Sequence, residues 1–299
     1  MENLIPPYIG KQYIILQLLA QGKFGNVFLG KIKKTDETII IKQGISPITP
    51  IPLNPTLPAK PKTTSGGTAA IETIRHEAEI LAFLNQDVSC RKYIPFIYWY
   101  GLCSKGVYCI AMNYIPTTPV EKYNDNLLQQ MVREITQALK AIHQKGVIHR
   151  DLKPENILYH PSKKRWMLID FGLATFYQDE DGIHKSPTTP PRKHLIGTPN
   201  FVSCFIHEGQ DPSRRDDLIA LGHVVWWLKN EGSWDNSQNT TFSWEQTLEY
   251  KKFLANQILP LEKTPENIFK LKLATVIKNC YTLGFTDTPP YDMITNFFA

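Results

Sequence analysis

The sequence has few features that would assign it to a secreted or membrane-embedded protein. It contains five cysteines, an odd number with no Cys-x-x-Cys pair, which favours reduced thiols over a disulfide framework or a structural zinc site. Its first residues lack the charged-then-apolar pattern of a secretory signal. No apolar run approaches the roughly 20 residues that a membrane-spanning helix needs. We therefore expect a cytoplasmic protein, with the nucleus as a second possibility, and no membrane association.

The sequence also has little excess charge and no internal repeat. Its 33 Lys and Arg residues against 28 Asp and Glu give a net charge of +5, and no segment forms a basic arm. This mild excess favours acidic or phosphorylated partners but is too small to indicate a nucleic-acid partner. With 42% hydrophobic and 20% charged residues in 299, the chain has an ordinary globular composition and could form one large core or two lobes. We expect a monomer.

The first part of the sequence predicts β-strands and one helix. Residues 71–84 carry apolar side chains at helical spacing. β-branched and aromatic residues cluster instead in five short segments, which we expect to be strands, at residues 13–16, 26–29, 38–41, 96–103 and 107–112.

A proline-rich insert occupies residues 44–70, between the last of the early strands and the helix. Six prolines fall within Ser46–Gly67, which ends in Ser65-Gly66-Gly67. Such a composition sustains neither a helix nor a sheet ladder, so we expect a loop over Ser46–Gly67. It could be a neutral insertion, since surface loops tolerate added length, or a docking segment for a partner.

Beyond Pro116 and Pro119 the sequence predicts mainly helices. Residues 126–145 have apolar positions at helical spacing. The sequence thus predicts an α+β fold with two lobes, a β-rich lobe over residues 1–115 with one main helix and a mostly helical lobe over 116–299, joined by a hinge near 113–118.

Two short motifs carry the chemistry. His149-Arg150-Asp151-Leu152-Lys153-Pro154-Glu155-Asn156 is followed, after a predicted hairpin, by Asp170-Phe171-Gly172. Asp151 can accept the proton of an attacking hydroxyl, although a carboxylate of ordinary pKa contributes mainly by positioning. Lys153 can stabilise charge that develops on a transferred phosphoryl group. Asn156 and Asp170 offer the oxygen ligands that Mg²⁺ prefers, and the hairpin would bring them to one site.

Both strings resemble the catalytic loop and the metal-binding loop of protein kinases. A chance match to one tripeptide is common, but the eight-residue string followed at this interval by the second one is specific. The resemblance implies the bilobal kinase fold and the transfer of the γ-phosphoryl of MgATP to hydroxyls of protein substrates, with a nucleotide-binding first lobe.

The resemblance also assigns a nucleotide site in the first lobe. A glycine-rich loop would comprise Ala20, Gly22, Gly25 and Val27, with Ala20 in place of the usual first glycine. Missing Cβ atoms let backbone amides approach phosphates. Such a glycine pair could also be an ordinary hairpin, but it precedes a strand that ends in a lysine.

That lysine, Lys42, would neutralise the α- and β-phosphates and needs an acidic partner. Glu77 is the first candidate, because it lies beside the apolar stripe of its predicted helix, and Glu79 is the second. Met112 would lie at the back of the adenine pocket, as a core residue as well. The three residues that would offer backbone groups to the base are Asn113, Tyr114 and Ile115.

The second lobe shows features of a particular kinase group. The Lys-Pro-Glu within the catalytic string resembles serine/threonine kinases. Phe201–Cys204 stands where most kinases have Ala-Pro-Glu, and Ser213-Arg214-Arg215-Asp216-Asp217 follows. These features resemble the casein kinase 1 superfamily, which includes the vaccinia-related kinases. The short chain and its insert would suit a member from a large DNA virus, acting in the host cytoplasm or carried in the virion.

The resemblance to protein kinases, together with the resemblance to this group, implies several residue roles. Asp217 would anchor the backbone of the catalytic loop, Thr198 of Gly197-Thr198-Pro199 would contact Asp151, and His149 would pack near Phe171. Substrate hydroxyls would lie near acidic or phosphorylated residues, for which the candidate contacts are Arg192, Lys193, Arg214, Arg215 and Lys229.

Two other functions stay open. A pseudokinase scaffold could bind partners through the proline-rich insert, and the departure at Ala20 favours it. A small-molecule phosphotransferase could share the fold, but Lys-Pro-Glu-Asn and Gly-Thr-Pro count against it.

Overall fold

The computed structural model describes residues 8–9, 12–22, 25–44, 65–103, 107–116, 123–234, 243–256 and 262–299. The chain divides into two compact units, one of residues 1–86 and 95–115 and the other of residues 87–94 and 116–299. Residues 87–94 precede the expected division after residue 115, yet they pack with the second unit. Most of the proline-rich insert lies outside the described residues.

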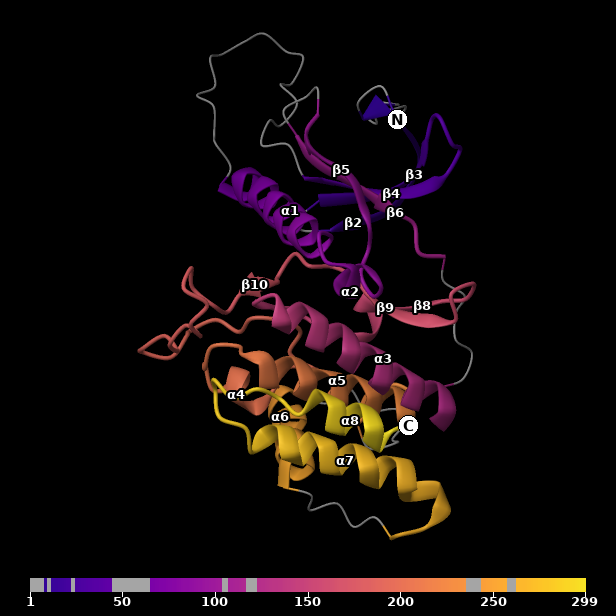
Figure 1. The fold of residues 1–299 in the computed structure, drawn as a ribbon. Coiled ribbons are helices and arrows are strands. Elements are labelled where there is room, and N and C mark those ends of the chain that lie inside the picture. The colour runs from indigo at the N-terminus through magenta and orange to yellow at the C-terminus, as the bar shows by residue number, and fades with distance from the viewer. Residues whose placement is uncertain are drawn as a thin grey trace. The chain divides into compact units, whose positions relative to one another are not determined.

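The first unit is built on a six-stranded antiparallel sheet (Figure 1). The strands lie in the order β1-β2-β3-β4-β6-β5, so neighbours in the sheet are neighbours in sequence except where β6 inserts between β4 and β5. The strands are β1 (Tyr8–Ile9), β2 (Tyr13–Gly22), β3 (Gly25–Ile32), β4 (Thr38–Gly44), β5 (Ile97–Leu102) and β6 (Tyr108–Asn113).

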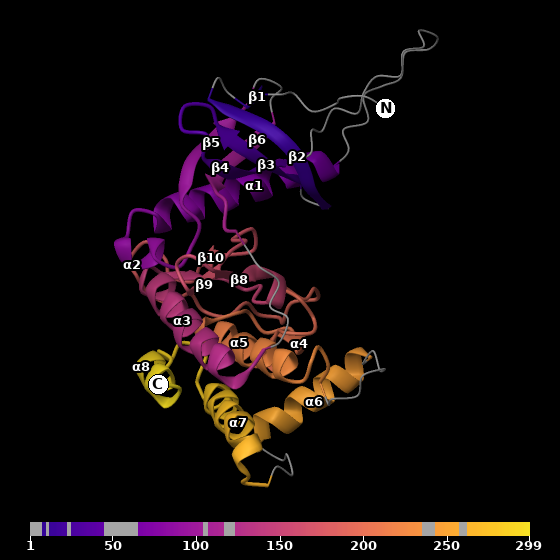
Figure 2. The ribbon, with the colours of Figure 1, turned by 90° about the vertical axis from the view of Figure 1, so that its right-hand side faces the viewer.

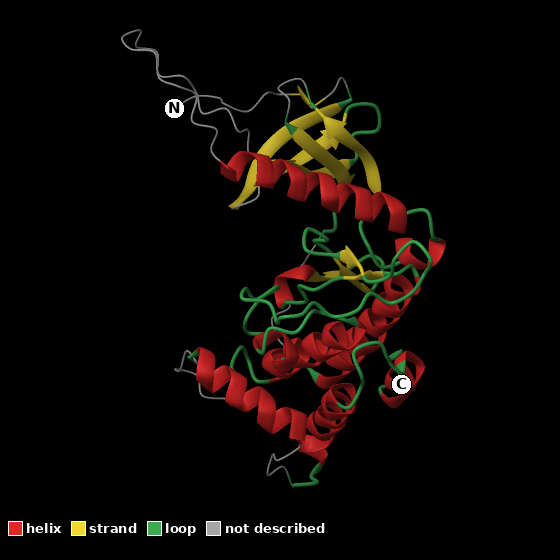
Figure 3. Cartoon of the chain, turned by 90° about the vertical axis from the view of Figure 1, so that its left-hand side faces the viewer, coloured by secondary structure: helices red, strands yellow, loops and turns green. Residues whose placement is uncertain are grey.

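The two faces of this sheet have different partners because side chains alternate along a strand. One face carries a core of its own, formed by Tyr13, Phe28, Ile39, Ile41, Cys109 and Ala111. Helix α1 (Ser65–Leu84) crosses the sheet, packing on β4, β5 and β6 (Figure 3). The helix begins six residues before the expected position, so Ser65-Gly66-Gly67 is helical and not part of a loop. Ala69 and Ala70, the best helix formers, favour this N-terminal extension.

The second unit is mainly helical. Its helix α3 (Asp125–Gln144) matches the expected helix to within one residue at each end, and it begins where the Asn124 side chain accepts the Leu127 N–H at 2.9 Å. The remaining helices are α2 (Val88–Arg91), α4 (Cys204–His207), α5 (Arg214–Lys229), α6 (Trp244–Asn256), α7 (Ile268–Tyr281) and α8 (Tyr291–Phe297). Short strands pair as β7 (Val147–Ile148) with β10 (Thr175–Phe176) and β8 (Ile157–His160) with β9 (Arg165–Leu168).

Helix α5 forms the centre of the second unit. Every residue from Arg215 to Trp226 is buried, with α3 and α7 packed against the helix (Figure 2). A Cβ on Gly222 would lie 2.5 Å from a side-chain carbon of Ile277, so only glycine lets α5 and α7 approach this closely. This rigid, buried helix carries Asp217. Within the described ranges, no helix is both long and apolar enough to cross a membrane.

Candidate active site

Four of the predicted nucleotide-site residues of the first unit share one face of the sheet. Ala20 pairs with Val27 across β2 and β3, and Val27 pairs with Lys42 across β3 and β4. Lys42 in turn pairs with Ile110, two residues before Met112 on β6. Directly paired residues, and residues two apart on a strand, project to the same face. Sheet register therefore gathers four predicted side chains, from three distant segments, on the face away from the Ile39–Ile41 core.

Lys42 is held by Glu77 of helix α1. The Lys42 Nζ lies 2.6 Å from Glu77 Oε1, and the Glu77 side chain is only 2% exposed. The alternative acid, Glu79, is 52% exposed and pairs with Arg75 instead. The structure thus brings together the first-choice pair. Because Glu77 is buried, removing Lys42 would leave a carboxylate without its cation, which is far more costly than breaking an exposed pair.

The two glycines of the predicted phosphate loop differ in how closely the surrounding backbone approaches the position of a Cβ atom. A Cβ on Gly25 would collide with the carbonyl oxygen of Gln43 on the neighbouring strand, so the sheet itself requires glycine there. A Cβ on Gly22 would meet only the Gly25 carbonyl oxygen, at an ordinary 3.8 Å. Packing of the described residues does not explain Gly22. The loop tip, Lys23 and Phe24, lies outside the described residues.

Asn113 departs in part from the expected base-binding role. Its backbone N–H donates to the Phe96 carbonyl at 3.0 Å, and its side-chain oxygen accepts the Phe96 N–H at 2.6 Å. This double link ties the end of β6 to the start of β5. The backbone donor of Asn113 is therefore engaged within the unit and is not available to a base. Ile115 is buried and Tyr114 is partly exposed.

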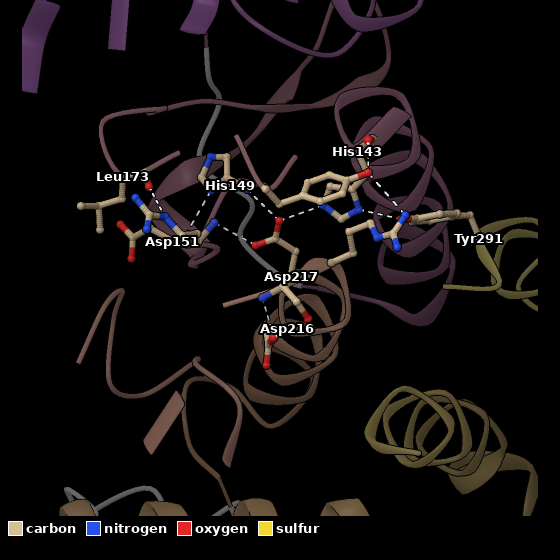
Figure 4. Close-up of polar contacts among 11 residues, drawn as sticks. His143, His149, Asp151, Leu173, Asp216, Asp217 and Tyr291 are labelled. Atoms are coloured by element: carbon tan, nitrogen blue, oxygen red, sulfur yellow. Dashed lines mark hydrogen bonds and ion pairs between the residues drawn. The ribbon is translucent and has the colours of Figure 1, made fainter. Parts of the chain in front are cut away.

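Asp217 anchors the catalytic loop of the second unit, as the sequence predicted (Figure 4). Its carboxylate accepts the backbone N–H groups of His149 at 2.7 Å and Arg150 at 2.8 Å. Arg150 has φ 70°, in the left-handed region that non-glycine residues rarely adopt. The loop backbone is held in this conformation by a carboxylate on the buried helix α5.

His143 and Tyr291 extend the anchor, and the sequence did not reveal either contribution. His143 Nε2 lies 2.9 Å from Asp217 and its Nδ1 lies 2.7 Å from the Tyr291 hydroxyl. Burial alone would raise the pKa of Asp217, but the hydrogen bonds from His143 and from the His149 backbone N–H outweigh it and lower that pKa. A histidine in the last turn of a helix is an ordinary dipole partner, so the sequence carried no signal for this role.

His149, in the first of the two sequence motifs, also contacts the second motif and the residue before it. Its Nε2 donates to the Ile169 carbonyl at 3.1 Å and its Nδ1 accepts the Asp151 N–H at 3.3 Å. Its ring meets Phe171 edge-on, with ring centres 4.9 Å apart. Burial lowers the pKa of His149, which keeps the imidazole neutral and suits one donor and one acceptor. The expected structural role of His149 is confirmed.

The Asp151 carboxylate is oriented from two sides. Thr198 Oγ1 donates to Oδ1 at 2.6 Å, which confirms the expected contact. Lys153 Nζ lies 3.1 Å from Oδ2. Asn156 Nδ2 donates to the Asp151 carbonyl at 2.8 Å and approaches Oδ2 at 3.3 Å. The predicted base is thus fixed in direction and lies beside the predicted phosphate-binding lysine.

The hairpin β8–β9 brings the two predicted metal-binding residues together. The Ile169 N–H donates to the Asn156 carbonyl at 2.9 Å, so Asn156 is adjacent to the residue before Asp170. Because the Asn156 Nδ2 already donates to Asp151, its Oδ1 is the atom that can face a cation. One amide oxygen and one carboxylate form a donor set that suits Mg²⁺ bound together with phosphate oxygens. The residues present therefore fit the metal.

The segment Phe201–Cys204, where the sequence lacks Ala-Pro-Glu, is hydrogen-bonded to the start of α5. Ser203 donates its hydroxyl to Asp216 at 2.5 Å, and Asp216 also accepts the Ser213 N–H at 2.8 Å at the start of α5. Burial raises the pKa of Asp216, although the hydrogen bonds that its carboxylate accepts act in the opposite direction. Ser203 is thus tied to the start of α5 by a buried hydrogen bond.

Most of the candidate substrate cations are engaged internally. Arg215 is 6% exposed, donates to the Leu283 carbonyl at 2.5 Å and stacks on Phe205, so the expectation that it meets a substrate is wrong. Its position in the first turn of a buried helix is the reason. The other pairs are Arg192 with Asp211, Lys229 with Asp125, and Arg214 with the Thr286 carbonyl, whereas Lys193 is exposed.

Together these features define a class of enzyme. A cation held on a sheet, an oriented carboxylate and a neighbouring pair of candidate Mg²⁺ ligands are the kinds of part with which phosphotransferases move a phosphoryl group.

A comparison with known families is more specific. The family model described as protein kinase domain matches residues 13–285, which is most of the chain. The chain belongs to the protein kinase domain family. Its β-sheet first region and helical second region are those of the kinase fold, and membership implies ATP, typically with Mg²⁺, and protein substrates.

Proposed function

We propose that the protein is an active serine/threonine kinase that transfers the γ-phosphoryl of MgATP to protein hydroxyls. The observation that carries this proposal is the environment of Asp151. Thr198 bonds one carboxylate oxygen at 2.6 Å and Lys153 lies 3.1 Å from the other. A base held this firmly next to a phosphate-binding cation has little use outside phosphoryl transfer.

Each residue then has a defined task. Asp151 orients the substrate hydroxyl and accepts its proton, while Lys153 stabilises negative charge on the transferred group. Lys42, aimed by Glu77, holds the α- and β-phosphates. Asn156 and Asp170 would hold Mg²⁺, which when bound neutralises phosphate charge and aligns the γ-phosphoryl group.

Serine/threonine specificity is supported by Lys153-Pro154-Glu155 within the catalytic loop. The test is transfer of radiolabel from ATP to casein and to matched peptides with serine, threonine or tyrosine as the only acceptor. We expect label on serine and threonine and none with Asp170→Ala. Equal incorporation by wild type and Asp170→Ala would refute a kinase, and label on tyrosine alone would refute the specificity.

A scaffold function is the alternative, favoured by Ala20 in the phosphate loop. It predicts that the protein binds nucleotide or partners without transferring phosphate. The same assay separates the two, because a scaffold gives no label above the Asp170→Ala control while retaining its fold.

Membership of the casein kinase 1 and vaccinia-related group is proposed from Ser213–Asp217 and from the absent Ala-Pro-Glu. A preference for acidic or phosphorylated sites follows from that resemblance, and the exposed Lys193 supports it. A peptide library with acidic, phosphorylated and neutral residues around one serine tests it. Equal rates across the library would remove the preference. Origin in a large DNA virus stays a prediction, as does cytoplasmic localisation, which agrees with five free cysteines.

A further inference from the structure

Helix α6 carries a lysine that is entirely buried. Lys251 has an exposed fraction of 0%, although lysine is among the residues least often found inside proteins. Its Nζ donates to the Pro199 carbonyl at 2.7 Å and lies 3.0 Å from Nε2 of His207. The ammonium also lies 5.6 Å from the centre of the Trp234 ring.

Among the residues that the structure describes, no carboxylate forms an ion pair with Lys251. Its polar contacts among the described residues are a carbonyl and an imidazole, and neither is a carboxylate. Burial lowers the pKa of Lys251 to about 7, and the neighbouring Cys204 offsets only part of this effect. The titratable groups that interact electrostatically with this cluster are Cys204, His207 and Glu208 of α4 and its end, His223 of α5, Tyr281 of α7 and Lys252 of α6 itself.

An unpaired cation in the interior lowers stability, so stability alone does not account for this side chain. An apolar residue of similar length would fill the same space without that cost. Groups that reduce stability and have a shifted pKa are frequent where a protein's function requires them.

Two contacts connect Lys251 to the Asp151 carboxylate: the hydrogen bond from Lys251 to Pro199, and the hydrogen bond from the preceding residue to Asp151. Pro199 directly follows Thr198, whose hydroxyl donates to Asp151 at 2.6 Å. On the other side, Gly197 has φ 98°, and a Cβ there would lie 2.5 Å from the Arg150 carbonyl oxygen. The turn formed by residues 197–199 therefore packs closely against the catalytic loop at Gly197 and accepts a hydrogen bond from the buried Lys251 at Pro199.

We propose that Lys251 is a positioning residue for protein substrates: it fixes the Gly197–Pro199 turn from inside the helical unit and so sets Thr198 against Asp151. The inference rests on the proposed kinase function. Lys251 touches neither substrate nor nucleotide in this role. It acts through the Pro199 carbonyl on the residues that orient the substrate hydroxyl.

The first test compares Lys251→Met with Lys252→Met, its exposed neighbour on the same helix. Wild-type phosphorylation of a serine peptide is measured first, so failure of the proposed function is seen separately. For Lys251→Met we expect a melting temperature equal to or above that of wild type. We also expect kcat/KM for the peptide to fall about tenfold or more, because small misplacements at a reacting centre have large effects on rate. The KM for ATP should stay within about twofold of the wild-type value. Lys252→Met should match wild type throughout.

Two results would overturn the proposal. One is peptide kcat/KM unchanged in Lys251→Met. The other is a parallel rise in the KM for ATP, which would indicate general damage to the enzyme. A purely structural lysine predicts a lower melting temperature with kinetic constants retained by the folded fraction.

The second test is made on the wild-type protein, with the two variants as controls, so it decides the matter even if Lys251→Met does not fold. The wild-type kcat/KM is measured from pH 6 to 9 with a peptide that has no group titrating in this range. We expect a severalfold decrease above pH 7, as Lys251 loses its proton and its charge-assisted bond to Pro199 weakens. Lys252→Met should show the same decrease and Lys251→Met should lack it. A flat wild-type profile would refute the proposal.

Discussion

The Asp217 carboxylate accepts the Arg150 backbone N–H at 2.8 Å and so holds a non-glycine residue in the left-handed region, directly before Asp151, the proposed base. The anchor is on a helix that is buried along most of its length. The direction of Asp151 therefore depends on the packing of α5 as much as on the catalytic loop.

Asp217→Ala should destabilise the second unit by about 3–5 kcal/mol, because buried N–H groups of His149 and Arg150 lose their acceptor. Urea denaturation measures the change in the free energy of unfolding. The matched control is Asp292→Ala, which breaks an exposed pair with Lys140 and should cost less than about 1 kcal/mol. Equal effects of the two substitutions would show that Asp217 is not an anchor.

Glu77→Gln should lower kcat/KM by about 100-fold, since Lys42 loses the charge that aims it at the phosphates. Glu79→Gln, two residues away on the same helix, should leave activity unchanged because its partner is Arg75. Steady-state kinetics with varied ATP measure both. Full activity in Glu77→Gln together with loss in Glu79→Gln would reverse the assignment of the acid.

The two glycines of the phosphate loop should respond differently to alanine. Gly25→Ala should destabilise the sheet by about 1–3 kcal/mol, because its Cβ collides with the Gln43 carbonyl oxygen. Gly22→Ala has room for its Cβ and should leave the melting temperature unchanged while raising the KM for ATP severalfold. An unchanged KM would mean that Gly22 belongs to an ordinary hairpin.

Stability should fall in mild acid because buried histidines are neutral. Burial lowers the pKa of His149 and His223 below the ordinary 6.5, so the unfolded chain binds their protons first as pH falls. The stabilisation is complete above pH 6.5 and is lost below it, at about 1.4 kcal/mol per pH unit for each histidine. Urea denaturation at pH 7.5, 6.5 and 5.5 measures this slope. Equal stability at all three values would contradict it.

The fold and the chemistry were predictable where the information is local. The string around Asp151 places three candidate side chains, Asp151, Lys153 and Asn156, within a few residues of one another, and the tripeptide at Asp170 adds the fourth, so two short sequences specify them. Helical periodicity located α3 to within a residue, because its apolar stripe is continuous. It missed the first residues of α1, where a glycine pair indicates a loop and neighbouring alanines favour a helix.

The sequence by itself indicated the candidate catalytic residues and the alternation of strands and helices, since both follow from neighbours along the chain. Only the tertiary structure decided that Glu77 and not Glu79 meets Lys42, that Arg215 turns inward, that Ser203 bonds to Asp216, and that Lys251 bonds to Pro199. These contacts join residues far apart in sequence, or choose between neighbours on one helix. They depend on which faces pack together, and that is set by the burial of whole elements.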